Sequence, residues 1–203
     1  MTPLAERLVG RAEELGALDR ALSERDHGQA GAIALMGEPG IGKTCLLAAL
    51  AAQADGLGHL VLSGSAAELE RDLPFSVFVD ALDEYLRGLD PRKLAGLSEE
   101  VRIELVHVFP SLSQLATGHD VALQHERYRA HHAVRALLEH LAGTQPLVLV
   151  LDDLHWADSA SVELLGALLR RPPAAPVLIA AALRPRPMPE RLSAALERAD
   201  RAG

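Results

Sequence analysis

The amino-acid sequence predicts an α/β fold, with a mostly parallel sheet between two layers of helices in a three-layer sandwich. Four short segments are mainly apolar, three of them along their whole length, stretches with helical periodicity separate them, and a glycine-rich turn follows the first. Strands of this kind are buried on both faces, and their alternation with helices is typical of parallel sheets. A chain of 203 residues suits one domain, so residues 1–203 are predicted to form a single domain.

The N-terminal third supplies the first four elements. Leu15, Leu18 and Leu22 recur at helical spacing, which predicts a helix over residues 9–22 with one apolar face. The polar and glycine-containing segment DHGQAG ends it. The elements after it are a strand at 32–36 (AIALM), a helix at 45–54 and a strand at 60–64 (LVLSG).

Residues 66–142 contain no convincing strand and are predicted to form a helical insertion beside the sheet. In the last of its helices we expect Tyr128, Val134, Leu138 and Leu141 to share one apolar stripe. The helical patterns cover residues 75–89, 98–109 and 122–143.

The remaining third returns to alternation of strands and helices. Asp158 or Ser159 is suited to cap the helix that follows the third strand. The predicted elements are a strand at 147–151 (LVLVL), a helix at 161–171, a strand at 177–183 (VLIAAAL) and a final helix at 190–199.

The segment GEPGIGKT matches the phosphate-loop pattern G-x-x-x-x-G-K-[ST] at every position. Glycines let the backbone wrap around a phosphate and aim N–H groups at it, and the helix that follows adds its positive end. Lys43 can reach the β- and γ-phosphates of ATP, and the Thr44 hydroxyl can ligate Mg²⁺. A predicted strand before the segment and a helix after it favour a nucleotide site over an ordinary glycine turn. The predicted nucleotide-binding residues here are Gly37, Glu38, Pro39, Gly40, Ile41, Gly42, Lys43, Thr44 and Cys45.

Two adjacent carboxylates, Asp152 and Asp153, end the buried strand LVLVL. Ligands of open α/β sheets bind at the carboxyl ends of the strands, so Asp152 is predicted to hold Mg²⁺, directly or through water. Asp153 is predicted to position the attacking water or to act as a base, although an aspartate reaches less far than a glutamate. The alternative is that the two carboxylates only cap a turn, and it is stronger for Asp153.

Arg184 follows the last buried strand. If that strand lies between the phosphate-loop strand and the Asp152 strand, Arg184 emerges beside the γ-phosphate, where a guanidinium could sense its presence. The alternative is a solvated arginine in a loop. Lys43, Asp152, Asp153 and Arg184 are therefore the predicted catalytic residues, with Thr44 and Asp152 as Mg²⁺ ligands.

Composition narrows the class of protein. The formal net charge is -8 with no long run of either sign, which argues against direct nucleic-acid binding by this chain. One cysteine fits a reducing compartment, no segment has the pattern of a secretory signal, and the apolar runs are too short for a membrane helix. We expect a cytoplasmic protein without membrane contact.

Four stretches together resemble the ATPase domain of the large ATP-binding LuxR-type transcription regulators, a group within the STAND class of signal-transduction ATPases. The resemblance spans nearly the whole chain, and DDLHWAD after an apolar strand is its most specific part. The stretches are LVGRAEELGALDRAL, GEPGIGKTCLL, LPFSVFVDAL and LVLVLDDLHWADSASVELLGALLRR.

The resemblance implies an AAA-like P-loop NTPase fold and a switch controlled by ATP and ADP. It implies that Val9, Gly10 and Arg11 lie over the nucleotide base, and that His155 and Trp156 either pack under the turn or sense phosphate. The strand order expected is 1-4-3-2, with the fifth strand that usually flanks the phosphate-loop strand missing. An uncovered edge there would favour self-association. Full-length relatives continue into a DNA-binding segment that is absent here, so we expect a fragment or a short member.

The sequence thus leads to two main functional hypotheses. The first is an ATP/ADP-binding regulatory switch with slow, Mg²⁺-dependent ATP hydrolysis, part of or related to a LuxR-type transcriptional regulator. The second is a non-hydrolysing, nucleotide-dependent module that binds a protein partner through the helices of residues 66–142. A phosphotransferase acting on a small molecule is a third possibility, but the sequence has no recognisable acceptor pocket.

Overall fold

A computed structural model describes residues 10–25, 28–115, 126–185, 193, 194 and 196. Its centre is a four-stranded sheet in the order β1-β4-β3-β2, and every neighbouring pair of strands is parallel. The register pairs Met36 with Leu183 and Ser65 with Asp152, so the carboxyl ends of the strands meet at one edge. The strands are β1 (Gly31–Met36), β2 (Leu60–Ser65), β3 (Leu147–Asp152) and β4 (Val177–Leu183).

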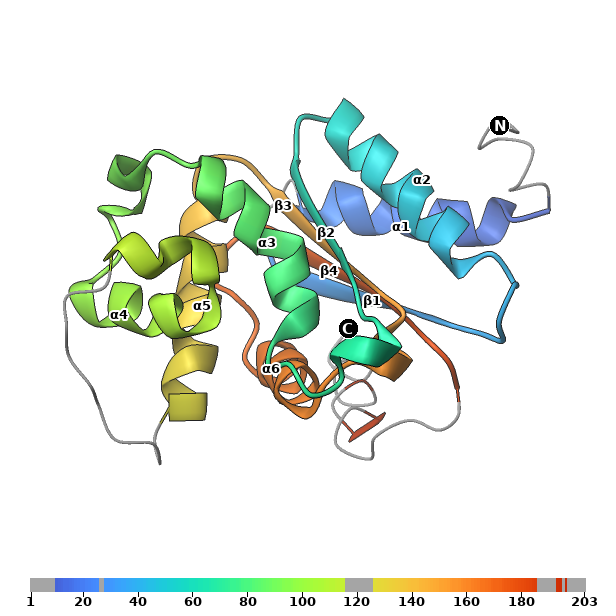
Figure 1. Cartoon of the computed structure of the whole chain (residues 1–203). Coiled ribbons are helices and arrows are strands. Elements are labelled where there is room, and N and C mark those ends of the chain that lie inside the picture. The colour runs from blue at the N-terminus through green and yellow to red at the C-terminus, as the bar shows by residue number, and fades with distance from the viewer. Residues whose placement is uncertain (1–9, 26–27, 116–125, 186–192, 195, 197–203) are drawn as a thin grey trace.

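Two helices cover one face of the sheet, α1 (Ala12–Arg25) and α2 (Lys43–Gly56), as Figure 1 shows. Leu18 and Leu22 of α1 are buried against this face, together with leucines of α2 such as Leu50. The even-numbered residues of the central strands, Val148 and Val150 among them, point to the same cluster because successive side chains of a strand alternate between faces.

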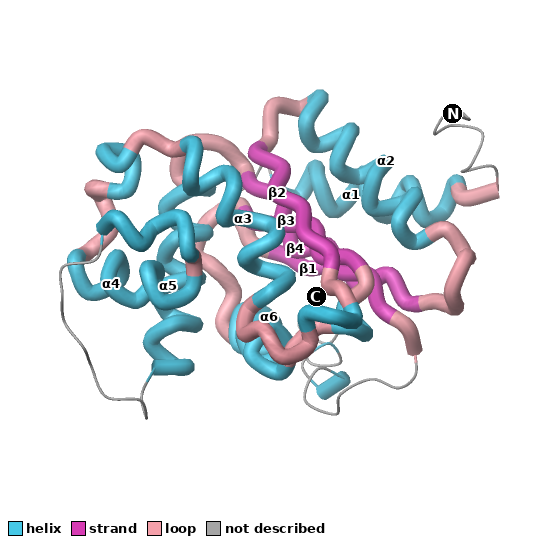
Figure 2. The backbone as a smooth tube through the Cα atoms, viewed as in Figure 1, coloured by secondary structure: helices cyan, strands magenta, loops and turns pink. Residues whose placement is uncertain are grey.

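The opposite face carries the larger core and the predicted insertion (Figure 2). Leu147, Leu149 and Leu151 of β3 point into it and are fully buried. The α-helices on this side are α3 (Ser76–Gly88), α4 (Glu99–Val108), α5 (Glu126–Ala142) and α6 (Ser159–Arg170). Short 3-10 helices connect them and are η2 (Glu68–Glu70), η3 (Pro91–Leu94), η4 (Pro110–Leu115) and η5 (Leu154–Trp156).

Two residues fix α3 against the sheet and against α6. Gly64 of β2 lets α3 approach closely, because an added Cβ there would lie 2.4 Å from the backbone oxygen of Val77. Asp158 is 4% exposed and accepts hydrogen bonds from Ser161 at the start of α6 and from Phe75 and Ser76 at the start of α3. One buried carboxylate therefore caps two helices.

The structure confirms the α/β class, the parallel sheet and the order 1-4-3-2. Residues 66–115 and 126–142 contain helices and no strand, in line with the predicted insertion. Asp158 is the residue that caps the helix after the third strand. The predicted final helix at 190–199 lies largely outside the described residues.

The predicted stripe on the last insertion helix is wrong in one position. Val134, Leu138 and Leu141 are buried in the core, whereas Tyr128 is 67% exposed. Six helical residues separate Tyr128 from Val134, which turns the side chain by about 240° around the axis and away from the core.

β1 is an edge strand of the described sheet. It is less buried than the other strands, and Met36 at its end is 60% exposed. Among the described residues, no helix is long and apolar enough to cross a membrane.

Candidate functional site

The predicted motifs converge at the carboxyl ends of β1, β4 and β3. β4 lies between the other two strands, which is the arrangement that Arg184 needs in order to emerge beside the γ-phosphate. The backbone N–H of Gly37, at the start of the phosphate loop, donates to the carbonyl of Leu183, directly before Arg184. The phosphate loop, Asp152 and Arg184 therefore share one edge of the sheet.

The phosphate loop has a backbone that only glycine adopts readily. Gly40 and Gly42 have φ angles of 79° and 97°, and nothing lies within 4 Å of a Cβ built on either. α2 begins directly after Gly42, so its unpaired N–H groups and positive dipole end face the loop. The Lys43 ammonium donates to the carbonyls of Gly37 (2.8 Å) and Glu38 (3.1 Å). The Lys43 ammonium therefore closes the loop, and phosphate oxygens could replace the two carbonyls as its hydrogen-bond acceptors.

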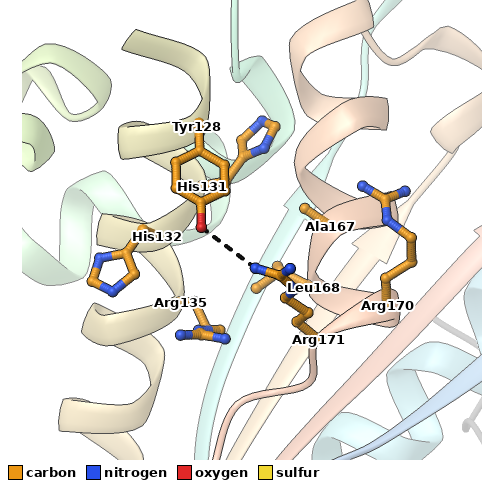
Figure 3. Close-up of a pocket in the computed structure, with 8 residues that line it drawn as sticks. All are labelled: Tyr128, His131, His132, Arg135, Ala167, Leu168, Arg170 and Arg171. Carbon is orange, nitrogen blue, oxygen red and sulfur yellow. Dashed lines mark hydrogen bonds between the residues drawn. The ribbon is translucent and has the colours of Figure 1, made fainter. Parts of the chain in front are cut away.

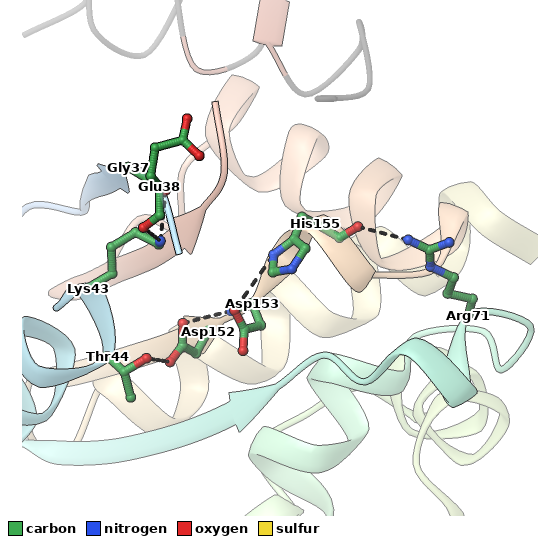
Figure 4. Close-up of polar contacts among 8 residues, drawn as sticks. All are labelled: Gly37, Glu38, Lys43, Thr44, Arg71, Asp152, Asp153 and His155. Carbon is green, nitrogen blue, oxygen red and sulfur yellow. Dashed lines mark hydrogen bonds and ion pairs between the residues drawn. The ribbon is translucent and has the colours of Figure 1, made fainter. Parts of the chain in front are cut away.

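Thr44 and Asp152 meet although 108 residues separate them. The Thr44 hydroxyl donates to Asp152 Oδ2 over 2.7 Å, and the backbone N–H of Asp153 donates to the other oxygen, Oδ1, at the same distance (Figure 4). A hydroxyl and a carboxylate side by side are the hard oxygen donors that Mg²⁺ prefers, so the two residues fit a magnesium ion. Asp152 also supports the turn, and its role as a Mg²⁺ ligand stays a prediction.

Asp153 lies at a strained position and faces solvent. Its φ is 51°, in the left-handed region, its side chain is 46% exposed, and the carboxylate makes no capping hydrogen bond to η5. The His155 ring nitrogen Nδ1 lies 3.6 Å from Asp153 Oδ1. The turn-capping alternative does not describe this carboxylate, which is open to a ligand or water.

The His155 side chain is buried close to several charges. It is only 7% exposed, and no described residue forms a hydrogen bond with either ring nitrogen. Burial lowers the pKa of His155, and the nearby charge of Arg184 lowers it further, with Lys43 and Arg71 adding to the effect against the opposing charge of Asp153. The lowered pKa favours the uncharged form of His155 at this turn, close to both Asp153 and Arg71.

Trp156 brings two guanidinium groups together. The Arg71 carbon Cζ lies 4.3 Å from the centre of the Trp156 ring, and Arg184 Cζ lies 5.9 Å from it. Arg71 also donates to the backbone oxygen of His155 over 3.4 Å. Sequence reasoning missed Arg71, because only the folded insertion brings it to this turn.

Arg11 reaches the phosphate loop from the N-terminal segment. One end of its guanidinium donates to the carbonyl of Ile41 over 2.6 Å, and the other pairs with Glu14. Gly10 precedes it with a φ of 82°, and Val9 lies outside the described residues. Arg11 thus supports the loop, while the place of the nucleotide base stays a prediction for Val9, Gly10 and Arg11.

A depression of about 280 Å³ opens beside Thr44 and Asp152. Ser63, Ser65 and Asp80 line its far side, and Asp80 accepts a hydrogen bond from the backbone N–H of Ser65. Asp80 belongs to α3 and was not singled out from the sequence, since its position next to β2 depends on how the insertion packs. Cys45, in the first turn of α2, is a half-buried free thiol.

Fold and site together define a P-loop domain that binds nucleotide. The chain matches the family described as "AAA ATPase domain" over residues 7–180 and belongs to that family. The match includes the phosphate loop, the insertion, the Asp152 turn and most of β4. No curated protein matches the chain.

Proposed function

We propose that the chain is an ATP/ADP-binding regulatory switch with slow, Mg²⁺-dependent ATP hydrolysis, related to the LuxR-type transcription regulators. The observation that carries this proposal is the contact between Thr44 and Asp152. The hydroxyl at the end of the phosphate loop and the carboxylate at the end of β3, which β4 separates from β1, are in hydrogen-bond contact over 2.7 Å. The carboxyl ends of the strands are where a magnesium nucleotide binds in this kind of sheet, and these two oxygen donors lie there.

Each residue of the site would have its own role in binding the nucleotide. Lys43 exchanges its two loop carbonyls for phosphate oxygens, and the N–H groups of the loop and of α2 surround the phosphates. Mg²⁺, held by Thr44 and Asp152, would neutralise charge on the phosphate oxygens. Arg184 approaches from β4 and contributes positive charge where the γ-phosphate is expected.

Hydrolysis would require a water in line with the γ-phosphate, and Asp153 is the residue available to hold it. Its carboxylate is exposed, and His155 lies 3.6 Å away as a neutral ring whose nitrogens have no hydrogen-bond partner among the described residues. An aspartate reaches less far than a glutamate, which agrees with slow turnover. His155 could orient Asp153 or hydrogen-bond to phosphate or water itself.

A regulatory role is supported by the connection between this site and the insertion. Arg71 joins the insertion to Trp156 and to the backbone of His155, and Arg184 lies near the same ring. A γ-phosphate that draws Arg184 towards itself would change this cluster and with it the setting of Arg71. Other chains, or a second copy at the β1 edge, are the expected partners.

The first experiment is to identify and count the nucleotide released when the purified protein is denatured. Stoichiometric ADP or ATP supports the proposal. An empty protein that also fails to take up added ATP with Mg²⁺ contradicts it. Lys43→Ala is the matched variant: it should lower nucleotide affinity at least about tenfold, because a donor to a charged group is lost.

The competing hypothesis is a module that binds nucleotide and a protein partner but does not hydrolyse ATP. The short side chain of Asp153 favours it. Asp153→Asn separates the two readings, because it removes the charge that holds the water and changes little in size. A fall in phosphate release with unchanged ADP affinity supports the switch with hydrolysis, and unchanged phosphate release supports the interaction module.

A further inference from the structure

A second cavity, of about 240 Å³, lies between α5 and α6 and shares no residue with the nucleotide site (Figure 3). One wall comes from the insertion and the other from the helix that follows the Asp152 turn. The residues that line it are Tyr128, His131, His132 and Arg135 from α5, and Ala167, Leu168, Arg170 and Arg171 from the end of α6.

The lining is basic in a protein that is acidic overall. Three arginines and two histidines border the cavity, and none of the eight described lining residues is acidic, whereas the whole chain has a net charge of -8. Like charges gathered around one cavity repel each other unless an anion lies among them. The local charge therefore favours an anionic ligand.

Two of the arginines have donors to spare. Within the described part of the chain, the Arg171 side chain makes a single hydrogen bond, a long one of 3.4 Å to the Tyr128 hydroxyl. The Nε atom of Arg135 is buried, no described residue accepts a hydrogen bond from it, and the nearest oxygen of Glu139 is 3.7 Å away. That oxygen already accepts a hydrogen bond of 2.9 Å from the backbone N–H of Ala174. Arg135 therefore has a long ion pair with Glu139 and Arg171 a long hydrogen bond with Tyr128, which leaves N–H donors of both guanidinium groups for a ligand.

The cavity also has an apolar side. Ala167 and Leu168 line it on α6, and Figure 3 draws the Tyr128 ring on α5 with its hydroxyl pointing to Arg171. The ring is 67% exposed. A flat, accessible aromatic surface beside spare guanidinium donors suits a ligand with one charged end and one apolar end.

We propose that this cavity binds a small phosphomonoester whose organic part is apolar or aromatic. Arg135 and Arg171 hold the phosphoryl oxygens, since the planar guanidinium matches a phosphate with parallel N–H donors. Tyr128, Ala167 and Leu168 contact the organic part. The volume of the cavity limits the ligand to a small molecule.

The end of α6 allows a simpler explanation for part of this charge. Cations near a helix C-terminus stabilise the helix, and Arg170 lies in the last turn of α6. That explanation accounts for Arg170 and Arg171 but not for Arg135, which lies in the middle of α5. If this explanation were complete, replacing these arginines would lower the stability of the helix, and the cavity would not bind phosphate compounds.

The test is a titration of the full chain with phenyl phosphate, followed by calorimetry and by the amide NMR signals of α5 and α6. It is done in the natural sequence and in Lys43→Ala, which removes the main phosphate donor of the nucleotide site. We expect one saturable site in both proteins. Arg171→Gln and Arg135→Gln should weaken binding about tenfold or more. Arg20→Gln, an exposed arginine on α1, is the matched control and should bind as the natural sequence does.

Three further measurements identify the class of ligand and separate weaker binding from misfolding of the variants. Inorganic phosphate should bind more weakly than phenyl phosphate, because it lacks the apolar part. A glutamate-rich peptide should not compete. Arg135→Lys, which keeps the charge but not the planar donors, should fold normally and still weaken binding.

The proposal is overturned by any of four results. Phenyl phosphate fails to bind at millimolar concentration, its binding disappears in Lys43→Ala, or it survives unchanged in the folded Arg135 and Arg171 variants. The fourth is that inorganic phosphate or the acidic peptide binds as well as phenyl phosphate, which would assign the cavity to another ligand.

Discussion

Replacing Asp158 by alanine should destabilise the whole domain, although the residue touches no predicted ligand. The carboxylate is 4% exposed and accepts hydrogen bonds from Phe75, Ser76 and Ser161. Ser76 and Ser161 are themselves buried, so their backbone N–H groups would be left without an acceptor. Each unsatisfied donor costs about 1–3 kcal/mol. We expect the free energy of unfolding to fall by roughly 3–5 kcal/mol, once the lost α6 cap is included.

Urea denaturation followed by far-UV circular dichroism measures this change, with Trp156 fluorescence as a second probe. Asp90→Ala is the matched control, because the Asp90 side chain is exposed and accepts one hydrogen bond from the described residues, from the Arg92 N–H at the start of η3. It should cost less than about 1 kcal/mol. Asp158→Asn keeps one accepting oxygen and should fall between the two. A loss for Asp158→Ala no larger than that for Asp90→Ala would refute the view that this carboxylate joins α3 to α6.

Three further predictions concern packing, pH and the nucleotide signal. Gly64→Ala should lower the free energy of unfolding by about 1–3 kcal/mol, because the added Cβ meets the backbone of Val77. Gly56→Ala is the control and should leave the stability unchanged, because its Cβ meets nothing within 4 Å. Equal urea midpoints for the two variants would contradict this prediction. The pKa of His155 is lower in the folded chain, so the unfolded chain binds a proton at this residue more tightly than the folded chain does. The free energy of unfolding should therefore fall as the pH drops below about 6.5. His155→Gln should flatten that slope, and an unchanged slope would contradict the assignment. The fluorescence of Trp156, the only tryptophan, should differ between the ATP and ADP complexes. The reason is that the centre of its ring lies 4.3 Å from Arg71 Cζ and 5.9 Å from Arg184 Cζ. Identical spectra would argue against a link between the γ-phosphate and these two arginines.

The sequence was sufficient for the fold because the strands carry an unambiguous signal. VLIAAAL is apolar at every position, and all seven of its residues are buried in the structure. The resemblance to the ATPase domain of LuxR-type regulators then implied the strand order. The surface of the insertion was harder to predict. Tyr128 was placed on the apolar stripe although its interval of six residues to Val134 does not match the helical repeat.

Contacts that depend on the packing of the insertion could not be predicted in the same way. Arg71 lies 84 residues before the carbonyl it binds, and Asp158 lies 83 residues after the N–H of Phe75. Neither spacing belongs to a local pattern, since these partners are set by how α3 and η2 lie on the sheet. Asp158 was predicted as the cap of one helix, but its second role at α3 has no signal in the sequence.

The seven residues from Asp152 to Asp158 join the nucleotide site to the insertion. At one end Asp152 contacts Thr44, and at the other Asp158 holds the start of α3. Between them, Trp156 and the backbone of His155 contact Arg71. Because the turn is attached at both ends, we expect a change at Asp152 to reach α3 and η2 without any need for ATP to be hydrolysed. Asp153 stands apart from these attachments, because its carboxylate is exposed and has only His155 nearby. Under the proposed function, coupling to the insertion and turnover of ATP would therefore depend on different residues, and a family member could lose the second and keep the first.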